Sequence, residues 1–283
     1  MNSHRTALIY LHVSVLLMGA SGVFGKLIST SPFFIVFGRV MFAAMALVIV
    51  MYCQRKVFKP QTLKDVFAFV ILGVLMAFHW FAFFHSIKIS SVAIGLLSFS
   101  TFTVMTMFLE PVFFKTRLNL MHIVMALLCF VGIGIIVTAG GGLSVDGAGM
   151  FWGLLAALSY AFMLLLNKSY VKRYSAITLT FYQCFVAMLV FLPVVLWMQE
   201  TVLRIDWFYL FIHGVICTAL AFTLYVASAK VISAQVISVV TMLEVLYGVM
   251  LAYFLLGEAL RGEMIIGGIF ILSASYLALR SKN

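Results

Sequence analysis

The chain has 283 residues, of which 65% are hydrophobic and 9% are charged, and its mean hydropathy is +1.21. Soluble domains usually hold about 25% charged residues, so this composition excludes a fold that is stable in water. The net charge of +10 does not indicate nucleic-acid binding, because the basic residues fall in short clusters between apolar runs. The four cysteines are far apart and form no CxxC pattern, so we expect neither a metal site nor a cofactor.

Long apolar runs follow one another along the whole chain. A helix that crosses a bilayer needs about 20 mostly apolar residues. Ten runs meet this condition, at roughly 6–26, 32–52, 64–84, 91–112, 119–138, 148–167, 176–198, 207–226, 233–256 and 263–280. We interpret the first run as a helix rather than a signal peptide, because no small-residue cleavage site follows it.

The loop charges predict the orientation, because Lys and Arg favour the cytoplasmic side of a membrane. If the N-terminus is cytoplasmic, 13 of the 18 basic residues lie inside, four lie outside, and Arg39 lies within a span. This bias predicts a multi-pass protein of the inner (plasma) membrane with both termini in the cytoplasm.

A weak internal repeat appears when the sequence is shifted by about 142–144 residues. The matches have a constant order, and they include Gly19 on Ala161, Lys26 on Lys168, Arg39 on Gln183, and Phe83 on Tyr225. Each half then holds five spans, and because five is odd the second copy must be inverted relative to the first. We therefore predict an all-α integral membrane protein of ten transmembrane helices in two inverted five-helix repeats, at 1–140 and 141–283.

Several short motifs are similar to a known family. They are Met18-Gly19 with Lys26, Pro32 with Arg39, Ile87 to Ala93, and Leu255 to Leu260, which reads as an LLGE-x-L pattern. With its five-plus-five spans, the chain resembles the EamA-type members of the drug/metabolite transporter superfamily over nearly its whole length. The family often has a proline in the middle of spans 4 and 9. Thr103 and Val245 stand there instead, so we expect the kinks to come from Gly95 and Gly248 or to be absent.

Two charged residues at membrane depth are candidate site residues. A charge at the bilayer centre costs about 2.5–3.5 kcal/mol on insertion scales, so such a residue usually faces a cavity or a partner. Glu244 lies near the middle of span 9, with Thr241 and Tyr247 on the same face. We predict that Glu244 binds an amine or carries a coupling proton, unless it only fixes helix packing. Arg39 is predicted to bind a carboxylate or phosphate, or to form a structural pair.

Aromatic, amide and hydroxyl side chains complete the predicted substrate site. His79 and Trp80, with Phe83 and Tyr225, suit a wall for a planar or amphipathic solute, although a lone histidine is often a core group. Hydroxyls and amides in other spans either line the cavity or join helices. The predicted substrate-binding residues are Glu244, Arg39, His79, Trp80, Tyr160, Gln183, Tyr225, Ser98 and Tyr247. His213 lies nearer the end of its span and is interpreted as interfacial.

The sequence predicts a secondary transporter rather than an enzyme. It would export or facilitate the passage of small organic metabolites, such as amino acids or amphipathic solutes, by alternating access through a central cavity. An importer of a vitamin- or nucleoside-like solute is the alternative on the same fold. GxxxxGK[ST] is absent, so we expect no ATP binding and no nucleic-acid partner, only a solute, the lipid bilayer and a coupling proton.

A hypothesis of another class is an intramembrane serine hydrolase. Gly19-Ala20-Ser21-Gly22 matches the GxSG form of intramembrane serine proteases. That chemistry needs a histidine, such as His79 or His213, to accept the Ser21 proton.

Overall fold

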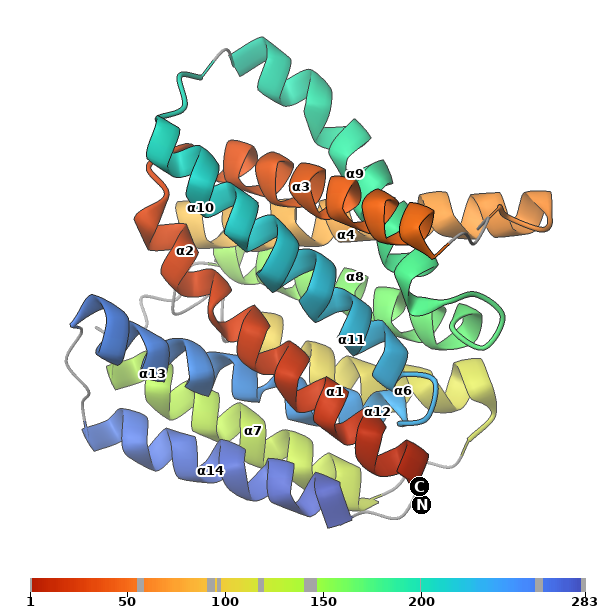
Figure 1. The fold of residues 1–283 in the computed structure, drawn as a ribbon. Helices are drawn as coiled ribbons and strands as arrows, with labels where there is room; N and C mark the ends of the chain where they lie inside the picture. The colour runs from red at the N-terminus through yellow and green to blue at the C-terminus, as the bar shows by residue number, and fades with distance from the viewer. Residues whose placement is uncertain are drawn as a thin grey trace. The chain divides into compact units, whose positions relative to one another are not determined.

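A computed structural model describes residues 2–54, 59–90, 95, 98–116, 120–139, 147–198, 200–257 and 262–280, and their regular structure is helical (Figure 1). The helices in chain order are α1 (Asn2–Gly19), α2 (Ser21–Leu27), α3 (Pro32–Cys53), α4 (Leu63–Ile89), α6 (Phe102–Phe114), α7 (Leu120–Ala139), α8 (Gly147–Tyr170), α9 (Ala176–Met198), α10 (Arg204–Gly214), the π-helix η1 (Val215–Leu220), α11 (Ala221–Ser228), α12 (Ala234–Thr241), α13 (Leu243–Leu256) and α14 (Gly262–Arg280). Each predicted apolar run overlaps at least one of these helices. The prediction of an all-α membrane fold is confirmed.

Seven helical stretches in the described residues are long and apolar enough to cross a membrane. They are His4–Gly25, Pro32–Cys53, Leu63–Ser86, Gly147–Tyr170, Ala176–Met198, Arg204–Ser228 and Ala234–Leu255. Three further apolar helices are shorter, at Ser98–Phe114, Leu120–Ile135 and Ile265–Leu277. The protein is therefore a multi-pass membrane protein, and the count of ten crossings stays a prediction.

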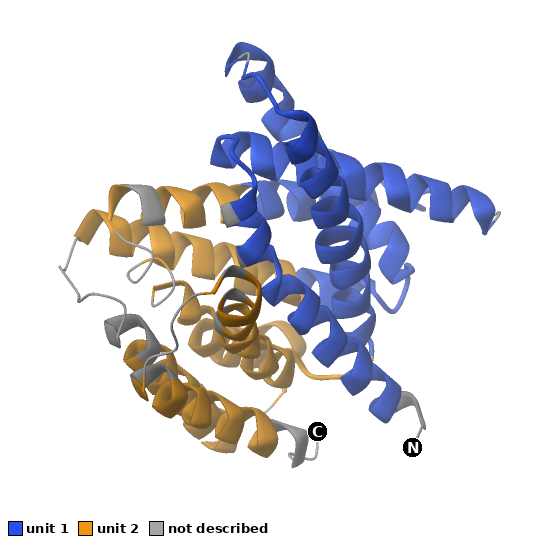
Figure 2. Cartoon of the chain, turned by 60° about the vertical axis from the view of Figure 1, so that its left-hand side comes forward, with its two compact units in different colours: residues 1–77, 166–230 blue, residues 78–165, 231–283 orange. Residues whose placement is uncertain are grey.

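The chain forms two compact units, and each unit takes one segment from each half of the sequence (Figure 2). Unit 1 comprises residues 1–77 and 166–230, and unit 2 comprises residues 78–165 and 231–283. Helices that the repeat makes equivalent contact each other within a unit. Helix α3 packs on α9 in unit 1, and α7 packs on α14 in unit 2. The two halves of the sequence are thus interleaved rather than folded separately.

Glycines allow two helix pairs, α7 with α14 and α10 with α3, to approach closely. A Cβ atom added at Gly132 of α7 would lie 2.6 Å from the Gly267 carbonyl oxygen of α14. A Cβ atom added at Gly214 of α10 would lie 2.7 Å from the Arg39 carbonyl oxygen of α3. Contacts shorter than 3 Å exclude any larger residue unless the backbones separate, so small residues fix the spacing of the helices.

Two helices of unit 2 are interrupted at positions that the repeat makes equivalent. The first break is at Thr101, between a turn of helix at Ser98 and α6, and the second is at Met242, between α12 and α13. At each break the backbone N–H bonds to the carbonyl three residues earlier, at 3.3 Å for Thr101 and 3.1 Å for Met242. Helix α13 continues through Gly248, so its break is not at this glycine, and the residues on both sides of Gly95 lie outside the described part of the chain.

Hydroxyl side chains explain these breaks without proline. The Thr101 hydroxyl donates to the Ser98 carbonyl at 2.6 Å, and the Thr241 hydroxyl donates to the Ile237 carbonyl at 2.7 Å. Such bonds to a carbonyl of the preceding turn compete with the backbone ladder and bend helices. The Thr103 hydroxyl also donates to the Ser238 carbonyl at 3.3 Å and so links the two broken helices.

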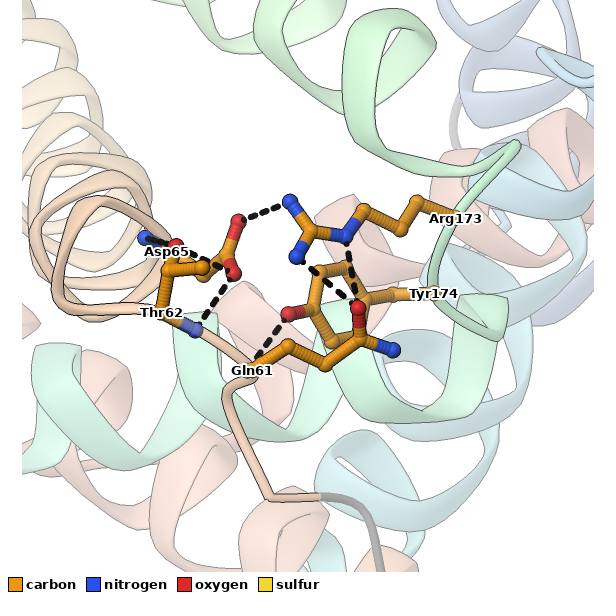
Figure 3. Close-up of polar contacts among 5 residues, drawn as sticks. All are labelled: Gln61, Thr62, Asp65, Arg173 and Tyr174. Carbon is orange, nitrogen blue, oxygen red and sulfur yellow. Dashed lines mark hydrogen bonds and ion pairs between the residues drawn. The ribbon is translucent and has the colours of Figure 1, made fainter.

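A polar cluster joins two turns of unit 1, the one before α4 and the one between α8 and α9 (Figure 3). Asp65 accepts hydrogen bonds from the Thr62 backbone N–H at 2.9 Å and hydroxyl at 2.7 Å, and so closes the first turn of its own helix. The same carboxylate pairs with Arg173 at 2.9 Å. The Arg173 Nε and Nη2 atoms donate to Gln61 Oε1 at 3.0 and 2.8 Å, and the Gln61 backbone N–H donates to the Tyr174 hydroxyl oxygen at 2.8 Å.

A second polar cluster joins the turn before α3 to the segment before and at the start of α10. Asp206 accepts hydrogen bonds from the Ser29 backbone N–H at 3.1 Å and from its hydroxyl at 2.6 Å. Glu200 accepts in the same way from the backbone N–H and hydroxyl of Ser31, at 2.6 and 2.5 Å. Ser31 is also the N-cap residue of α3. Carboxylates of one repeat thus bind turns of the other at two places in unit 1.

Candidate functional site

A buried arginine organises a polar cluster among the helices of unit 1. The Arg39 side chain leaves α3, and its Nε atom donates to the Thr218 hydroxyl at 3.0 Å. Its Nη2 atom lies 3.5 Å from the Ser21 hydroxyl oxygen of α2. Ser21 in turn lies 2.8 Å from Nε2 of His213, in α10. Three separate segments therefore converge on one guanidinium group, which is only 6% exposed.

The π-helix η1 positions the far side of this cluster. Thr218 lies within η1, and its hydroxyl donates to the His213 carbonyl five residues earlier at 3.0 Å. The five-residue separation is that of a π-helical turn, and such turns are frequent at functional sites. The π-helix η1 therefore lies at the point where Thr218 contacts the Arg39 side chain.

His213 is a core residue, so its interpretation as interfacial is wrong. The side chain is 2% exposed, and its ring stacks on Phe24 with 5.6 Å between the ring centroids. Its Nδ1 atom is buried and has no hydrogen-bond partner among the described residues. No local sequence signal identifies His213 or Thr218 as neighbours of Arg39, because they lie far along the chain.

The other predicted residues of unit 1 are fully buried. Gln183 of α9 exchanges two hydrogen bonds with Asn167 of α8, at 2.9 and 3.2 Å, and also donates to the Leu179 carbonyl. This amide pair joins two helices, which is the alternative role for such groups. Tyr225 of α11 is buried and packs against Phe222, with 6.2 Å between ring centroids.

In unit 2, several of the predicted site residues belong to an aromatic cluster around His79. The His79 ring lies 4.9 Å from the Tyr160 ring and 5.0 Å from the Phe99 ring, measured between centroids. Phe102 lies 4.9 Å from Tyr160, and Phe83 lies 5.4 Å from Phe99. The structure therefore brings together His79, Phe83 and Tyr160, which the sequence predicts to be near a solute. Trp80 is buried in the same unit, whereas Tyr225 belongs to unit 1.

His79 has a defined hydrogen-bonding role within this cluster. Its Nδ1 atom lies 3.1 Å from the Ala156 carbonyl oxygen of α8, which orients the ring. Ser98 approaches the same helix α8 from another segment, since a Cβ atom added at Gly153 would lie 2.4 Å from the Ser98 Cβ atom. Ser98 is thus a packing contact between α8 and the segment before α6.

Glu244 does not lie in a continuous helix. It is the second residue of α13, directly after the break at Met242. Its side chain is half-buried, as is that of Tyr247, whereas Thr241 at the end of α12 is buried. Backbone hydrogen bonds continue across the break, from the Met242 N–H to the Val239 carbonyl at 3.1 Å and from the Val245 N–H to the Met242 carbonyl at 3.3 Å. Glu244 is thus an acidic residue in the first turn of α13.

No group of three or more histidine, cysteine or acidic side chains is arranged to hold a metal ion in the part of the chain that the structure describes. The LLGE-x-L motif lies partly outside the described residues, since 258–261 are not among them, and the same holds for the Ser91 to Ala93 part of the earlier motif. The candidate functional residues are therefore the Arg39 cluster in unit 1 and, in unit 2, the His79 cluster and Glu244.

Comparison of the sequence with known protein families gives one family that matches both halves of the chain. The model of the EamA-like transporter family matches the chain twice, over residues 5–138 and 147–280. The chain belongs to the EamA-like transporter family. The two matches confirm the resemblance and the repeated architecture, and they make this EamA protein a membrane transporter. The boundaries 1–140 and 141–283 remain a prediction.

Curated relatives cover most of this EamA protein. The uncharacterized transporter YxxF of Bacillus subtilis (strain 168) is 27% identical over 247 residues, covering 84% of this chain and 78% of the relative. An uncharacterized transporter of Archaeoglobus fulgidus is 26% identical over 270 residues, covering 95% and 94%. The S-adenosylmethionine uptake transporter of Rickettsia bellii is 23% identical over 276 residues, covering 96% and 92%.

A solved structure has the same fold. A crystal structure of a protein with 15% sequence identity superimposes with a TM-score of 0.83, covering 97% of this chain and 98% of the other. At this identity the match concerns the fold alone. The helix arrangement of the EamA protein is therefore one that is also found by experiment.

Proposed function

We propose that this protein is a secondary transporter or facilitator that moves small organic metabolites, of the amino-acid or amphipathic type, by alternating access. The observation that carries the proposal is the combination of a transporter family with buried polar groups at membrane depth. Such groups are costly in lipid, so a passing solute is the simplest reason to keep them. We also propose that the protein resides in the inner (plasma) membrane with both termini in the cytoplasm, as the loop charges predict.

The described side chains support an amphipathic solute with a cationic group. The rings of His79, Phe99 and Tyr160 offer flat apolar faces, and electron-rich aromatic faces also attract cations. Glu244 supplies a carboxylate at a helix break, where an amine would find a charge-assisted acceptor. A coupling proton carried by Glu244 is a further hypothesis on the same residue. The remaining predicted residues are proposed to line the path of the solute.

The named relatives narrow the solutes to be tested. Three Rickettsia relatives carry the name S-adenosylmethionine uptake transporter, each 23% identical to this chain. S-adenosylmethionine combines an amino acid with a nucleoside, so it joins the two solute classes that the sequence leaves open. We therefore propose amino acids and S-adenosylmethionine as the first solutes to assay, for import as well as export.

Transport in proteoliposomes tests the proposal. Vesicles with purified protein should take up at least one labelled amino acid, or S-adenosylmethionine, faster than protein-free vesicles. Equal rates for every solute would contradict the proposed substrate class. Glu244→Gln should lower uptake about tenfold or more if the carboxylate binds the amine. Glu200→Gln is the matched control, because it removes the same charge at a turn that Ser31 binds.

The same vesicles separate solute binding from proton coupling. If Glu244 carries the proton, Glu244→Gln should abolish the dependence of uptake on a pH gradient and leave solute exchange intact. An unchanged pH dependence would remove the proton role. It would leave the transport function itself in place.

A second candidate function rests on the contact between Ser21 and His213. Their 2.8 Å separation is the geometry of a nucleophile and its general base. One observation opposes it: Nδ1 of His213 has no orienting partner among the described residues, whereas a general base of this kind is held in place by a third group. Labelling with a fluorophosphonate decides the matter. Covalent labelling that Ser21→Ala abolishes would support a hydrolase, and no labelling would contradict it.

A further inference from the structure

One short helix of unit 2, α12, is buried along its whole length. All eight of its residues, Ala234–Thr241, are buried, and within the unit the helix packs on α6, α7 and α14. The α13 helix that follows it carries Met250 and Phe254, which are 44% and 71% exposed. The α12 segment is therefore an internal part of the bundle, whereas α13 has an exposed face.

The N-terminal end of α12 is bound by a carboxylate from another helix. Glu110, near the end of α6, accepts hydrogen bonds from the backbone N–H groups of Ala234 and Gln235 at 2.9 and 2.8 Å. The first N–H groups of a helix have no intrahelical partners and carry a partial positive charge, so they stabilise a carboxylate. Glu110 is only 2% exposed, and this charge-assisted contact therefore joins the ends of α6 and α12 in the interior.

The same end of α12 also contacts α7. Nδ1 of His122 forms a hydrogen bond with Oε1 of Gln235, so Gln235 meets α6 through its backbone and α7 through its side chain. Further along α12, the Thr103 hydroxyl of α6 donates to the Ser238 carbonyl at 3.3 Å, which is a longer contact between neutral groups. The charged contact to α6 is thus concentrated at the N-terminal end.

The opposite end of α12 has the features of a hinge. Met242 separates α12 from α13, and its backbone N–H bonds to the Val239 carbonyl, three residues earlier, at 3.1 Å. The Thr241 hydroxyl donates to the Ile237 carbonyl at 2.7 Å. A 3₁₀-type bond within a longer helix often marks a functional hinge, and side-chain bonds to the preceding turn bend helices. Helix α12 can therefore turn about Met242 when its other end is released.

The carboxylate is not a requirement of the helix break itself. The other copy of the repeat has an equivalent break at Thr101. A shift of 142–144 residues places residues 252–254, which are Ala, Tyr and Phe, opposite Glu110. None of these side chains carries a carboxylate. Both copies thus have the break, and the carboxylate distinguishes the copy that contains α12.

We propose that α12 is a movable gate on the solute path, with its hinge at Met242 and with Glu110 as the latch that keeps it closed. The inference rests on the proposed transport function, because it assigns a moving part to alternating access. On the proposed orientation, the end of α6 and the start of α12 both lie toward the cytoplasm. Release of the Glu110 latch would let α12 move away from α6 and open the path on that side.

Labelling of the native cysteines reports on the gate without any cysteine variant. The Cys129 thiol of α7 is 1% exposed and lies 4.0 Å from the Val239 carbonyl of α12, so it lies against the gate. Cys184 and Cys217 of unit 1 are also buried and serve as references. The purified protein is treated with N-ethylmaleimide, and the label at each cysteine is measured by mass spectrometry. In wild type, Cys129 should react faster than both references, because local opening requires less free energy than global unfolding.

The Glu110→Gln variant should release the latch. The amide keeps the size of the side chain, but it has no charge and offers one acceptor oxygen in place of two. Labelling of Cys129 should become about 10- to 100-fold faster, as expected for the loss of hydrogen bonds to a charged group, and labelling of Cys184 should not change. Glu200→Gln is the matched control, because it removes a carboxylate that binds Ser31 at a turn of unit 1 and should leave the Cys129 rate unchanged.

Three labelling results would overturn the proposal. A wild-type rate at Cys129 in Glu110→Gln would show that the carboxylate does not hold the gate. Equal acceleration at Cys129 and Cys184 would show that it supports the whole fold instead. Equal rates at the three buried cysteines of wild type would exclude a local opening, and this measurement does not depend on whether the variant folds.

A reversible cross-link tests whether the gate must move during transport. In a variant without the native cysteines, His122→Cys and Gln235→Cys place two thiols on α7 and α12, where the native side chains meet. A bifunctional methanethiosulfonate should stop solute uptake into proteoliposomes, and reduction of the cross-link should restore it. A contact with a purely structural role would be unaffected, because the cross-link keeps the two helices together. The two single-cysteine variants, treated with the same reagent, are the controls.

These measurements separate the gate from the transport function. Full uptake by the cross-linked protein would overturn the gate while supporting transport. No uptake of any amino acid or of S-adenosylmethionine before cross-linking would contradict the proposed transport. The labelling rates alone would then decide whether Glu110 holds α12 in place.

Discussion

The two polar clusters at the turns of unit 1 both join separate segments through a carboxylate, but the carboxylates bind different partners. Asp65 is the third residue of α4 and Asp206 is the third residue of α10, and the repeat makes these helices equivalent. Asp65 closes its own helix and binds an arginine, whereas Asp206 binds the neutral Ser29 of the opposing turn within the described part of the chain. On the proposed orientation the arginine lies at the cytoplasmic end, where positive charge is favoured. The two helices thus share a carboxylate at the same position and differ in the partner that it binds.

Removal of Asp65 should have the largest effect on stability. Asp65→Ala removes the helix cap and leaves Arg173 and Thr62 without their carboxylate partner, so we expect the greatest fall in the thermal midpoint. Unfolding can be followed with a thiol-reactive dye, because Cys129, Cys184 and Cys217 are buried in the folded protein. The exposed Lys64→Ala is the adjacent control. A midpoint equal to that of wild type would break the comparison between the clusters.

Removal of Asp206 should have a smaller effect. Asp206→Ala loses two hydrogen bonds to a charged group, each worth roughly 1.5–3 kcal/mol, but no cap of its own helix. The same dye assay should therefore give a midpoint between those of Asp65→Ala and wild type. Ile205→Ala, at an exposed neighbour, serves as the control. A fall greater than that of Asp65→Ala would reverse the ranking.

Salt should distinguish the cluster with the Asp65–Arg173 ion pair from the cluster in which Asp206 binds Ser29. Arg173 is 42% exposed, so its attraction to Asp65 is screened when NaCl rises from about 50 mM to about 1 M. Arg173→Gln should therefore show a smaller loss of thermal midpoint with salt than wild type does. Ser29→Ala should keep the salt response of wild type. An identical salt response in Arg173→Gln and wild type would contradict an electrostatic contribution.

The smallest expected effect concerns Tyr174 at high pH. Burial raises the pKa of the Tyr174 phenol above its ordinary value of 10.0, so folding favours the protonated form. This contribution is complete below the pKa of the unfolded chain and is lost as pH rises through the higher folded pKa. Wild type should therefore lose slightly more stability than Tyr174→Phe between about pH 8 and about pH 11. Parallel curves for the two proteins would contradict the prediction.

The sequence predicted the helices well because the length of an apolar run is itself the physical requirement for crossing lipid. It did not predict the breaks at Thr101 and Met242, because hydroxyl bonds to the preceding turn act without proline or glycine. The cap formed by Thr62 and Asp65 was readable as a Thr-x-x-Asp pattern before an apolar run. Its partner Arg173 was not, because it lies 108 residues away.

The candidate functional residues also include some that the sequence predicts and some that it does not. Arg39 and Glu244 stand out in the sequence because ionisable residues are rare in apolar spans. The surroundings of Arg39 do not, because Thr218 and Ser21 are 179 and 18 residues away, and the further step from Ser21 to His213 is 192 residues. The sequence shows which residues are costly to place in a membrane. The side chains that offset this cost come from distant parts of the chain and become visible only in the folded structure.

The π-helical turn η1 gives the helix between Arg204 and Ser228 a register that depends on a single residue. A π-turn accommodates one residue more than an α-turn, and each residue of an α-helix advances the direction of its side chain by about 100°. Deleting one residue from 215–220 would straighten the segment into ordinary helix and rotate everything after it. Tyr225 and Ser228 would then turn out of the interior, and Thr218 would lose its reach to the guanidinium. A one-residue deletion in this membrane helix would therefore act as a rotation of its second half rather than as a shortening.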